Sequence, residues 1–114
     1  MSEPWRVEFY VDARGHCPAY EFLLSLPKRE QAEMLRVIDL LKEFGVKLGM
    51  PHARPIAGMW ELRAGAGRCF YVSHHGQRFI ILHGYRKKSQ SAPRKEIETA
   101  KRRWTEFLSQ ENES

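Results

Sequence analysis

The sequence predicts a small α+β domain, in which one antiparallel sheet carries a helical hairpin and a C-terminal helix in the order β-α-α-β-β-β-α. Apolar residues recur every three or four positions in segments 28–44 and 92–109, which is the spacing of an amphipathic helix. Between residues 59 and 85, short glycine-containing turns separate three stretches of strand-like composition. The 114 residues suffice for one domain, which we expect to span residues 1–114.

The first strand is expected within residues 5–11, where aromatic and β-branched side chains alternate with polar ones. Pro18 then fits the first turn of a short helix, because its missing N–H is not needed there. A longer helix is predicted over residues 28–44, and Gly45 is a suitable C-terminal stop. The expected apolar stripe of this helix comprises Met34, Leu35, Ile38, Leu40 and Leu41.

Residues 46–58 contain two glycines and two prolines and are predicted to form a connecting loop. Three strands are expected after it, over residues 59–63, 68–73 and 78–85. The glycine turns between them are short, so these strands should form an antiparallel meander.

The last helix is predicted from about residue 92 to residue 109, with Ser91 as its cap and Pro93 in its first turn. The acidic tail, residues 110–114, is expected to be frayed. The predicted buried face of the helix comprises Ile97, Ala100, Trp104, Phe107 and Leu108.

Charge is distributed unevenly along the chain. Residues 1–62 hold 8 Lys/Arg and 9 Asp/Glu, residues 63–103 hold 11 Lys/Arg and 2 Asp/Glu, and residues 104–114 add three glutamates. A positive field concentrated in one third of the chain attracts polyanions, and nucleic acid is the commonest of these in the cytosol. A basic face that is merely solvated is the alternative.

Two arginines are expected to lie close together across a hairpin. Arg63 ends one predicted strand and Arg68 opens the next. Two guanidinium groups repel each other unless an anion lies between them, and the planar fork of arginine matches phosphate oxygens. We interpret the pair as a phosphate clamp. Alternatively each arginine pairs elsewhere, and Glu61, on the same strand face as Arg63, is then the nearest acid.

The segment from His83 to Lys88 is the densest in groups suited to chemistry. Histidine exchanges protons near neutral pH, tyrosine stacks on bases, and lysines neutralise charge that develops on a phosphate. Strand alternation places His83, Tyr85 and Lys87 on one face. His83 as an ordinary hydrogen-bonded side chain and Tyr85 as a core residue are the alternatives.

Other basic residues are expected to attract RNA in a general way. For those on the last helix, solvated surface is an equal explanation. These residues are Arg78, Arg86, Lys101, Arg102 and Arg103.

No cofactor or metal is expected. His16-Cys17 and His74-His75 lack the ligand spacing of a structural zinc site. The turn 65–67 joins two strands and does not open a helix, so it is not a nucleotide-cradling loop. No apolar run approaches the ~18 residues of a membrane span, and the first residues lack a signal-peptide pattern. We therefore expect a cytoplasmic protein without a membrane contact.

Four stretches, taken in order and spacing, carry a family resemblance. They are Met59-Trp60-Glu61-Leu62-Arg63, Arg68-Cys69-Phe70-Tyr71, Ile80-Ile81-Leu82-His83-Gly84-Tyr85-Arg86-Lys87-Lys88, and Pro93 with Glu96-Ile97 and Ala100. Together they resemble the phage-derived HigB-type branch of the RelE/ParE toxin superfamily of type II toxin–antitoxin systems. The resemblance covers residues 59–100 closely, and the first half of the chain agrees in layout.

The resemblance implies a RelE/ParE toxin fold and an endoribonuclease that cleaves messenger RNA on the ribosome. In such enzymes the ribose 2′-hydroxyl attacks the adjacent phosphate without a metal. By motif position, Arg63 and Arg68 would hold that phosphate. Lys87 and Lys88 would stabilise charge or transfer a proton, and His83 and Tyr85 would serve in acid–base work or base stacking.

The resemblance also implies a helix-turn-helix antitoxin as partner, and a monomer when that partner is absent. Two alternatives stay open from the sequence. One is a non-catalytic ParE-like inhibitor that binds a target protein such as DNA gyrase. The other is an inactive, decayed member of the superfamily.

Overall fold

The structure is a computed structural model that describes residues 5–89 and 93–113. It confirms the α+β fold class and adds one strand and a short 3-10 helix to the predicted order. The elements are β1 (Arg6–Phe9), α1 (Pro18–Ser25), α2 (Lys28–Phe44), η1 (Gly45–Lys47), β2 (Ala53–Ile56), β3 (Met59–Ala64), β4 (Gly67–His74), β5 (Arg78–Arg86) and α3 (Arg94–Glu113).

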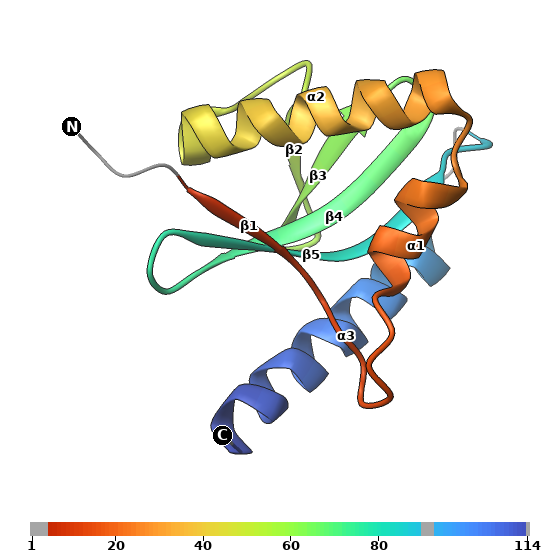
Figure 1. Cartoon of the computed structure of the whole chain (residues 1–114). Coiled ribbons are helices and arrows are strands. Elements are labelled where there is room, and N and C mark those ends of the chain that lie inside the picture. Colours follow the sequence, from red (N-terminus) through yellow and green to blue (C-terminus); the bar gives the residue numbers. More distant parts are fainter. Residues whose placement is uncertain (1–4, 90–92, 114) are drawn as a thin grey trace.

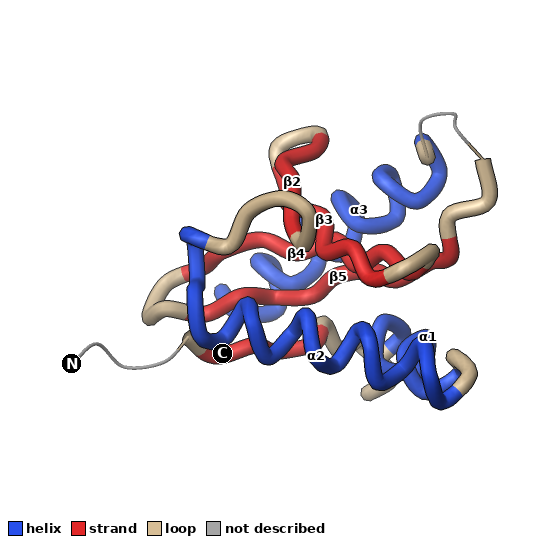
Figure 2. Tube along the Cα trace, turned by 90° about the horizontal axis from the view of Figure 1, so that it is seen from above, coloured by secondary structure: helices blue, strands red, loops and turns tan. Residues whose placement is uncertain are grey.

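The five strands form one sheet in the order β1-β5-β4-β3-β2. The sheet is mixed, because β1 pairs parallel with β5 while the other pairs are antiparallel. In Figure 1, α2 lies over one face of the sheet and α3 lies under the other. Figure 2, seen from above, shows α1 and α2 together on one side and α3 on the opposite side. The fold therefore has three layers, with the sheet in the middle.

Each face of the sheet has its own hydrophobic core. Leu62, Tyr71 and Ile81 pack against α1 and α2, whereas Phe70 and Ile80 pack against α3. The predicted face of α3 is largely confirmed, since the side chains packed into the second core are Ile97, Ala100, Trp104 and Phe107.

The apolar stripe of α2 differs from the prediction at one position. Met34, Ile38 and Leu41 are buried as expected, but Leu35 is 44% exposed and Val37 is buried in its place. Positions 34, 37, 38 and 41 follow the i, i+3, i+4, i+7 spacing of a single helix face, and position 35 lies outside it. The helix ends at Phe44, and its C-cap is Gly45, which has a φ of 59°.

The prediction of a connecting loop over residues 46–58 was wrong for the second half of this segment. β2 pairs with β3 across a two-residue turn in which Ala57 and Gly58 both have positive φ. Such turns match the twist of a hairpin. Pro55 is compatible with β2 because this strand lies at the sheet edge, where a missing N–H breaks no ladder.

A β-bulge in β5 sets the face on which the later strand residues lie. Tyr71 is opposite Ile81, whereas Phe70 is opposite His83, so Leu82 is the extra residue. Beyond the bulge, the α1 side of the strand carries Gly84. A Cβ at this position would overlap the Phe22 ring, so α1 can approach β5 here only because residue 84 is glycine.

The last helix extends further than predicted, to Glu113, and the acidic tail expected to be frayed is helical to that residue. Its Glu111 pairs with His74 and Arg78, which ties this end of the helix to the sheet. The predicted cap, Ser91, lies outside the described residues. None of the helices within residues 5–89 and 93–113 has both the length and the apolar character needed to cross a membrane.

Candidate functional site

Two rows of side chains cross the sheet on the α3 side. Each row consists of residues that are paired across neighbouring strands, and the two rows lie next to each other on this face. The first row comprises Arg63, Arg68 and Tyr85, because Arg63 pairs with Arg68 and Arg68 with Tyr85. The second row comprises Arg54, Glu61, Phe70 and His83. Strand pairing thus places the two predicted clamp arginines directly opposite each other, as the sequence indicated.

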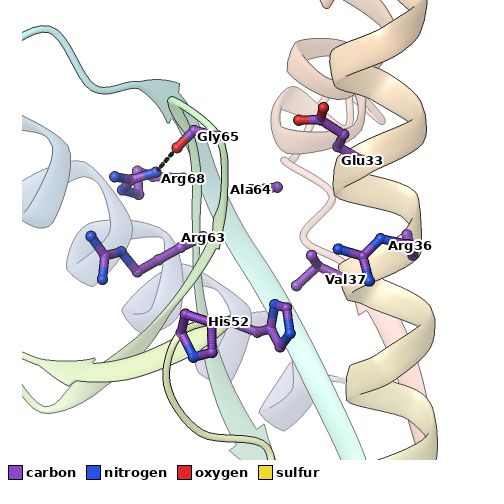
Figure 3. Close-up of a pocket in the computed structure, with 9 residues that line it drawn as sticks. Glu33, Arg36, Val37, His52, Arg63, Ala64, Gly65 and Arg68 are labelled. Carbon is purple, nitrogen blue, oxygen red and sulfur yellow. Dashed lines mark hydrogen bonds between the residues drawn. The ribbon is translucent and has the colours of Figure 1, made fainter.

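The hairpin turn holds Arg68 rigidly. Its Nη1 donates to the carbonyl oxygens of Gly65, at 2.6 Å, and Gly67, at 2.9 Å. Figure 3 shows the first of these bonds and both arginine side chains on the side of the hairpin away from α2. Arg68 is only 7% exposed, and its Nε has no hydrogen-bond partner among the described residues. The pKa of Arg68 is lowered by burial and by the neighbouring charge of Arg63.

Glu61, in the second row, is a fully buried acid. Its Oε1 accepts a hydrogen bond from Arg54 Nε at 2.9 Å and lies 3.8 Å from Arg68 Nε. Its Oε2 accepts from the Tyr85 hydroxyl at 3.0 Å. The sequence suggested Glu61 as a competing partner for Arg63, but these contacts go to other residues. Within the described chain, Arg63 makes no ion pair; its Nη1 donates to Met50 Sδ at 3.8 Å, and its buried Nε has no hydrogen-bond partner.

Tyr85 packs against the second core and also belongs to the first row. Its ring packs on Phe70, with centroids 5.4 Å apart, and stacks on His83. Burial, together with the hydrogen bond to Glu61, raises the pKa of the Tyr85 hydroxyl above its ordinary value. Its proton is therefore directed at Glu61.

Both ring nitrogens of His83 are in hydrogen bonds. Arg103 Nη1 donates to Nδ1 at 2.9 Å, and Nε2 lies 3.2 Å from Glu96 Oε1. An arginine cannot accept, so Nδ1 is unprotonated in this arrangement and Nε2 carries the hydrogen. Burial lowers the pKa of His83, an effect that the adjacent Glu96 opposes. The geometry favours a neutral histidine that ties β5 to α3.

Lys87 and Lys88 follow β5 directly. The Lys87 N–H donates to the Ala66 carbonyl at 2.8 Å, so the ladder with β4 continues one residue past the strand. Alternation from Tyr85 then places Lys87 on the same face as Arg68. Neither lysine has an ion pair within the described ranges, and both line a cavity with Tyr85 and Glu96.

A second cavity, of about 540 Å³, lies where the β3–β4 hairpin meets α2. Arg63 and Arg68 contribute to one wall. Figure 3 shows Arg36 extending from α2 toward the space beside His52. The sequence prediction included neither of these two residues, since an exposed arginine on a helix and a histidine in a loop carry no motif.

The remaining predicted RNA-binding residues do not join the two rows. Arg78 lies at the other end of β5 and pairs with Glu8 and Glu111. Arg86 pairs with Glu30 at 2.8 Å. On α3 the predicted residues divide, because Lys101 and Arg102 are exposed whereas Arg103 turns inward to His83 and to the Leu82 carbonyl.

Two residues of the buried network escaped the sequence prediction. Arg54 lies on β2, which the sequence did not reveal as a strand, and Glu96 lies on α3 opposite His83. For Glu96, as for Glu61, only its place in the family pattern could have indicated a role in the site, because no local periodicity does.

Comparison with known proteins gives one family and one fold. The sequence model of the family described as "Phage derived protein Gp49-like (DUF891)" matches residues 21–105. None of the curated proteins compared with the chain matches it. Among solved structures, the toxin–antitoxin complex RelBE2 from Mycobacterium tuberculosis is similar, with a TM-score of 0.54 and 24% identity. The match covers 74% of this chain and 99% of the other, and it shows a shared fold.

Proposed function

Because the chain belongs to the family of phage-derived Gp49-like proteins, we propose that it is the toxin of a type II toxin–antitoxin system and cleaves messenger RNA on the ribosome. We place it in the HigB-type branch of the RelE/ParE superfamily, on the motifs between residues 59 and 100. The main support for this proposal is the first row, in which Arg63 and Arg68 face each other. Within the described residues, Arg63 has no carboxylate partner. An anion such as phosphate would relieve their repulsion.

The proposed reaction needs charge stabilisation and two proton transfers. The ribose 2′-oxygen bonds to phosphorus as its proton passes to a base, and the bond from phosphorus to the 5′-oxygen breaks as that oxygen takes a proton. The products are a 2′,3′-cyclic phosphate and a 5′-hydroxyl. Negative charge grows on the phosphate oxygens in the transition state, where fixed cationic donors are most effective.

The contacts suggest a division of roles among the predicted catalytic residues. Arg63 and Arg68 would hold the phosphate oxygens, and Arg68 is already fixed by the turn carbonyls. His83 and Tyr85 direct their protons to Glu96 and Glu61, so we assign them to support and, for the Tyr85 ring, base stacking. Proton transfer would then fall to Lys87, on the face of Arg68, with Lys88 stabilising charge.

The proposed partner is an antitoxin. The similar fold from Mycobacterium tuberculosis was solved as a toxin–antitoxin complex, and the HigB-type branch implies a helix-turn-helix antitoxin. We expect this chain to be a monomer on its own and to act in the cytoplasm, where translating ribosomes are. Co-expression with the product of the adjacent reading frame, followed by purification of a stable complex, tests the partner.

Induced expression in a bacterial host tests the activity. We expect growth arrest, with messenger RNA cut at positions that primer extension can map, and relief of the arrest by Arg68→Ala or Lys87→Ala. Arg14→Ala, which alters an exposed arginine outside the sheet, is the control and should stay toxic.

Three outcomes would contradict the proposal. Full toxicity of both site variants would refute the assigned residues. Intact transcripts with damaged DNA would instead identify an inhibitor of a target such as DNA gyrase. Absence of any phenotype, with folded protein present, would identify an inactive family member.

A further inference from the structure

The Glu61 carboxylate lies at the centre of the two side-chain rows and has no solvent exposure. A buried carboxylate is costly unless charged or polar partners surround it. Here both oxygens are used, Oε1 by Arg54 at 2.9 Å and Oε2 by the Tyr85 hydroxyl at 3.0 Å. Rotation of the carboxylate would break one of these bonds, so its orientation is fixed.

Arg68 is held between this carboxylate and the hairpin turn. Its Nη1 hydrogens go to the Gly65 and Gly67 carbonyls, and its Nε faces Glu61 Oε1 at 3.8 Å without a hydrogen bond. The turn fixes one end of the guanidinium plane, and Glu61 lies beside the other. Tyr85, the next residue in the row, is held by the same carboxylate.

We propose that Glu61 is a positioning residue of the RNA-cleaving site, whose buried carboxylate aligns the Arg68 guanidinium and the Tyr85 ring for the phosphate and its neighbouring base. Arg54 on the edge strand β2 anchors Glu61 and so belongs to the same support. This inference rests on the proposed function, because it deepens the assignment of Arg68 and Tyr85.

The charges around Glu61 allow an experiment to distinguish a role in positioning Arg68 from a role in attracting RNA. One carboxylate faces two arginines, Arg54 and Arg68. Removing its charge strengthens the positive field and should leave RNA affinity unchanged or raise it. Removing an alignment should slow cleavage. The two explanations therefore predict effects of opposite sign in Glu61→Gln.

The experiment compares Glu61→Gln with Glu43→Gln, which makes the same charge change on an exposed residue of α2. Cleavage of one defined messenger is followed in a reconstituted translation reaction as protein concentration is varied. We expect the plateau rate of Glu61→Gln to fall by at least about tenfold, while the half-saturating concentration stays equal or falls. Glu43→Gln should change neither. An unchanged plateau rate in folded Glu61→Gln would overturn the inference.

A readout that needs no activity separates this inference from the proposed function. In an NMR spectrum of arginine side chains, the Nε–H of Arg68 should give a resolved, slowly exchanging signal. That signal should broaden or shift in Glu61→Gln and stay in place in Glu43→Gln. An unmoved signal would refute the positioning role, even if the wild-type protein cleaves no RNA. A moved signal with inactive wild type would refute only the proposed function.

Tyr85→Phe provides a second test of the proposal in case Glu61→Gln does not fold. It removes the hydroxyl that donates to Oε2 but keeps the ring that packs on Phe70. With its melting temperature near that of wild type, we expect the same displacement of the Arg68 signal and a several-fold slower plateau rate. An Arg68 signal and a rate that both match wild type would overturn the proposal.

Discussion

The two ends of β5 are both rich in arginine, but they differ in how completely their positive charges are paired with carboxylates. At the start of the strand, Arg78 makes two hydrogen bonds to Glu8, at 2.7 Å and 3.0 Å, and contacts Glu111 at 3.4 Å. At the other end, Arg86 pairs with Glu30 and Arg68 lies 3.8 Å from Glu61. Within the described residues, however, Arg63 and Lys87 have no ion pair. Residues 78 and 86 are separated by about 26 Å along an extended strand. A basic segment thus contains a compensated end and an incompletely compensated end.

From this difference we expect that pairing, more than charge count, determines where an anion can bind. A cation whose donors already serve carboxylates has little to offer a phosphate, whereas one with unused donors has a reason to bind it. The hydrogen bonds to Glu8 and the charge of Glu111 raise the pKa of Arg78, in contrast to the lowered pKa of Arg68. The two arginines therefore differ in environment although they lie in the same sheet.

The sharpest test of the comparison replaces one arginine at each end. Arg68→Gln should slow messenger RNA cleavage by about 10²–10³-fold, the cost of removing one donor to a developing negative charge. Arg78→Gln should stay within about twofold of wild type, since its partners are protein carboxylates. Rates measured in a translation reaction decide this, with melting curves to confirm folding. Equal losses in both variants would remove the distinction between the two ends.

The lysines after β5 test the incompletely compensated end through the salt dependence of RNA binding. Lys87→Gln and Lys88→Gln should each weaken binding to an uncleavable single-stranded RNA by about tenfold at low salt. Each should also reduce the slope of log affinity against log salt concentration by about 0.7, because one phosphate contact fewer releases fewer counterions. Binding titrations at several salt concentrations measure both quantities. An unchanged slope would exclude the lysine in question from phosphate contact.

A smaller effect is expected in the pH dependence of stability near His83. Burial lowers the pKa of His83 in the folded protein below its unfolded value of about 6.5. The unfolded state therefore takes up this proton first as pH falls. The contribution is fully present above about pH 6.5 and is lost as pH falls from there toward the folded pKa.

Denaturant unfolding at a series of pH values measures this contribution. Wild type should lose more stability than His83→Gln between pH 6.5 and lower pH. Parallel curves for the two proteins would show that His83 titrates equally in the folded and unfolded states.

The smallest effect is expected when the carboxylates that pair with Arg78 are removed, which makes the two ends of β5 more alike. Glu8→Gln with Glu111→Gln should free Arg78 and increase non-specific RNA affinity by about two- to threefold at low salt. The gain should vanish near physiological salt, because exposed charges are screened there. Affinity that stays at the wild-type value at low salt would show that position, rather than pairing, keeps Arg78 from binding RNA.

Much of the fold could be predicted because its signals are local. The period of the apolar residues identifies α2, α3 and the meander of β3 to β5, and Gly45 marks the end of α2. The sequence did not reveal β2, because Pro55 and the turn residues around it have loop-like composition. Only the neighbouring strand β3 makes an edge strand of that segment.

For the candidate site, local sequence patterns already indicate which residues lie next to one another in the sheet. The spacing of Arg63 and Arg68 around a glycine turn fixes them as cross-strand neighbours, and alternation aligns Tyr85 with Lys87. These relations depend on residues within one hairpin or one strand.

Whether those residues stay available depends on the packing of elements that are distant in the sequence. Glu8 reaches Arg78 across 70 residues of chain, Arg103 reaches His83 across 20, and Tyr85 reaches Glu61 across 24. Such partners come from other strands and from α3, and no local pattern records them. The physical reason is that local periodicity sets the face on which a side chain lies, whereas the packing of distant elements sets whether its charge and hydrogen bonds are already satisfied.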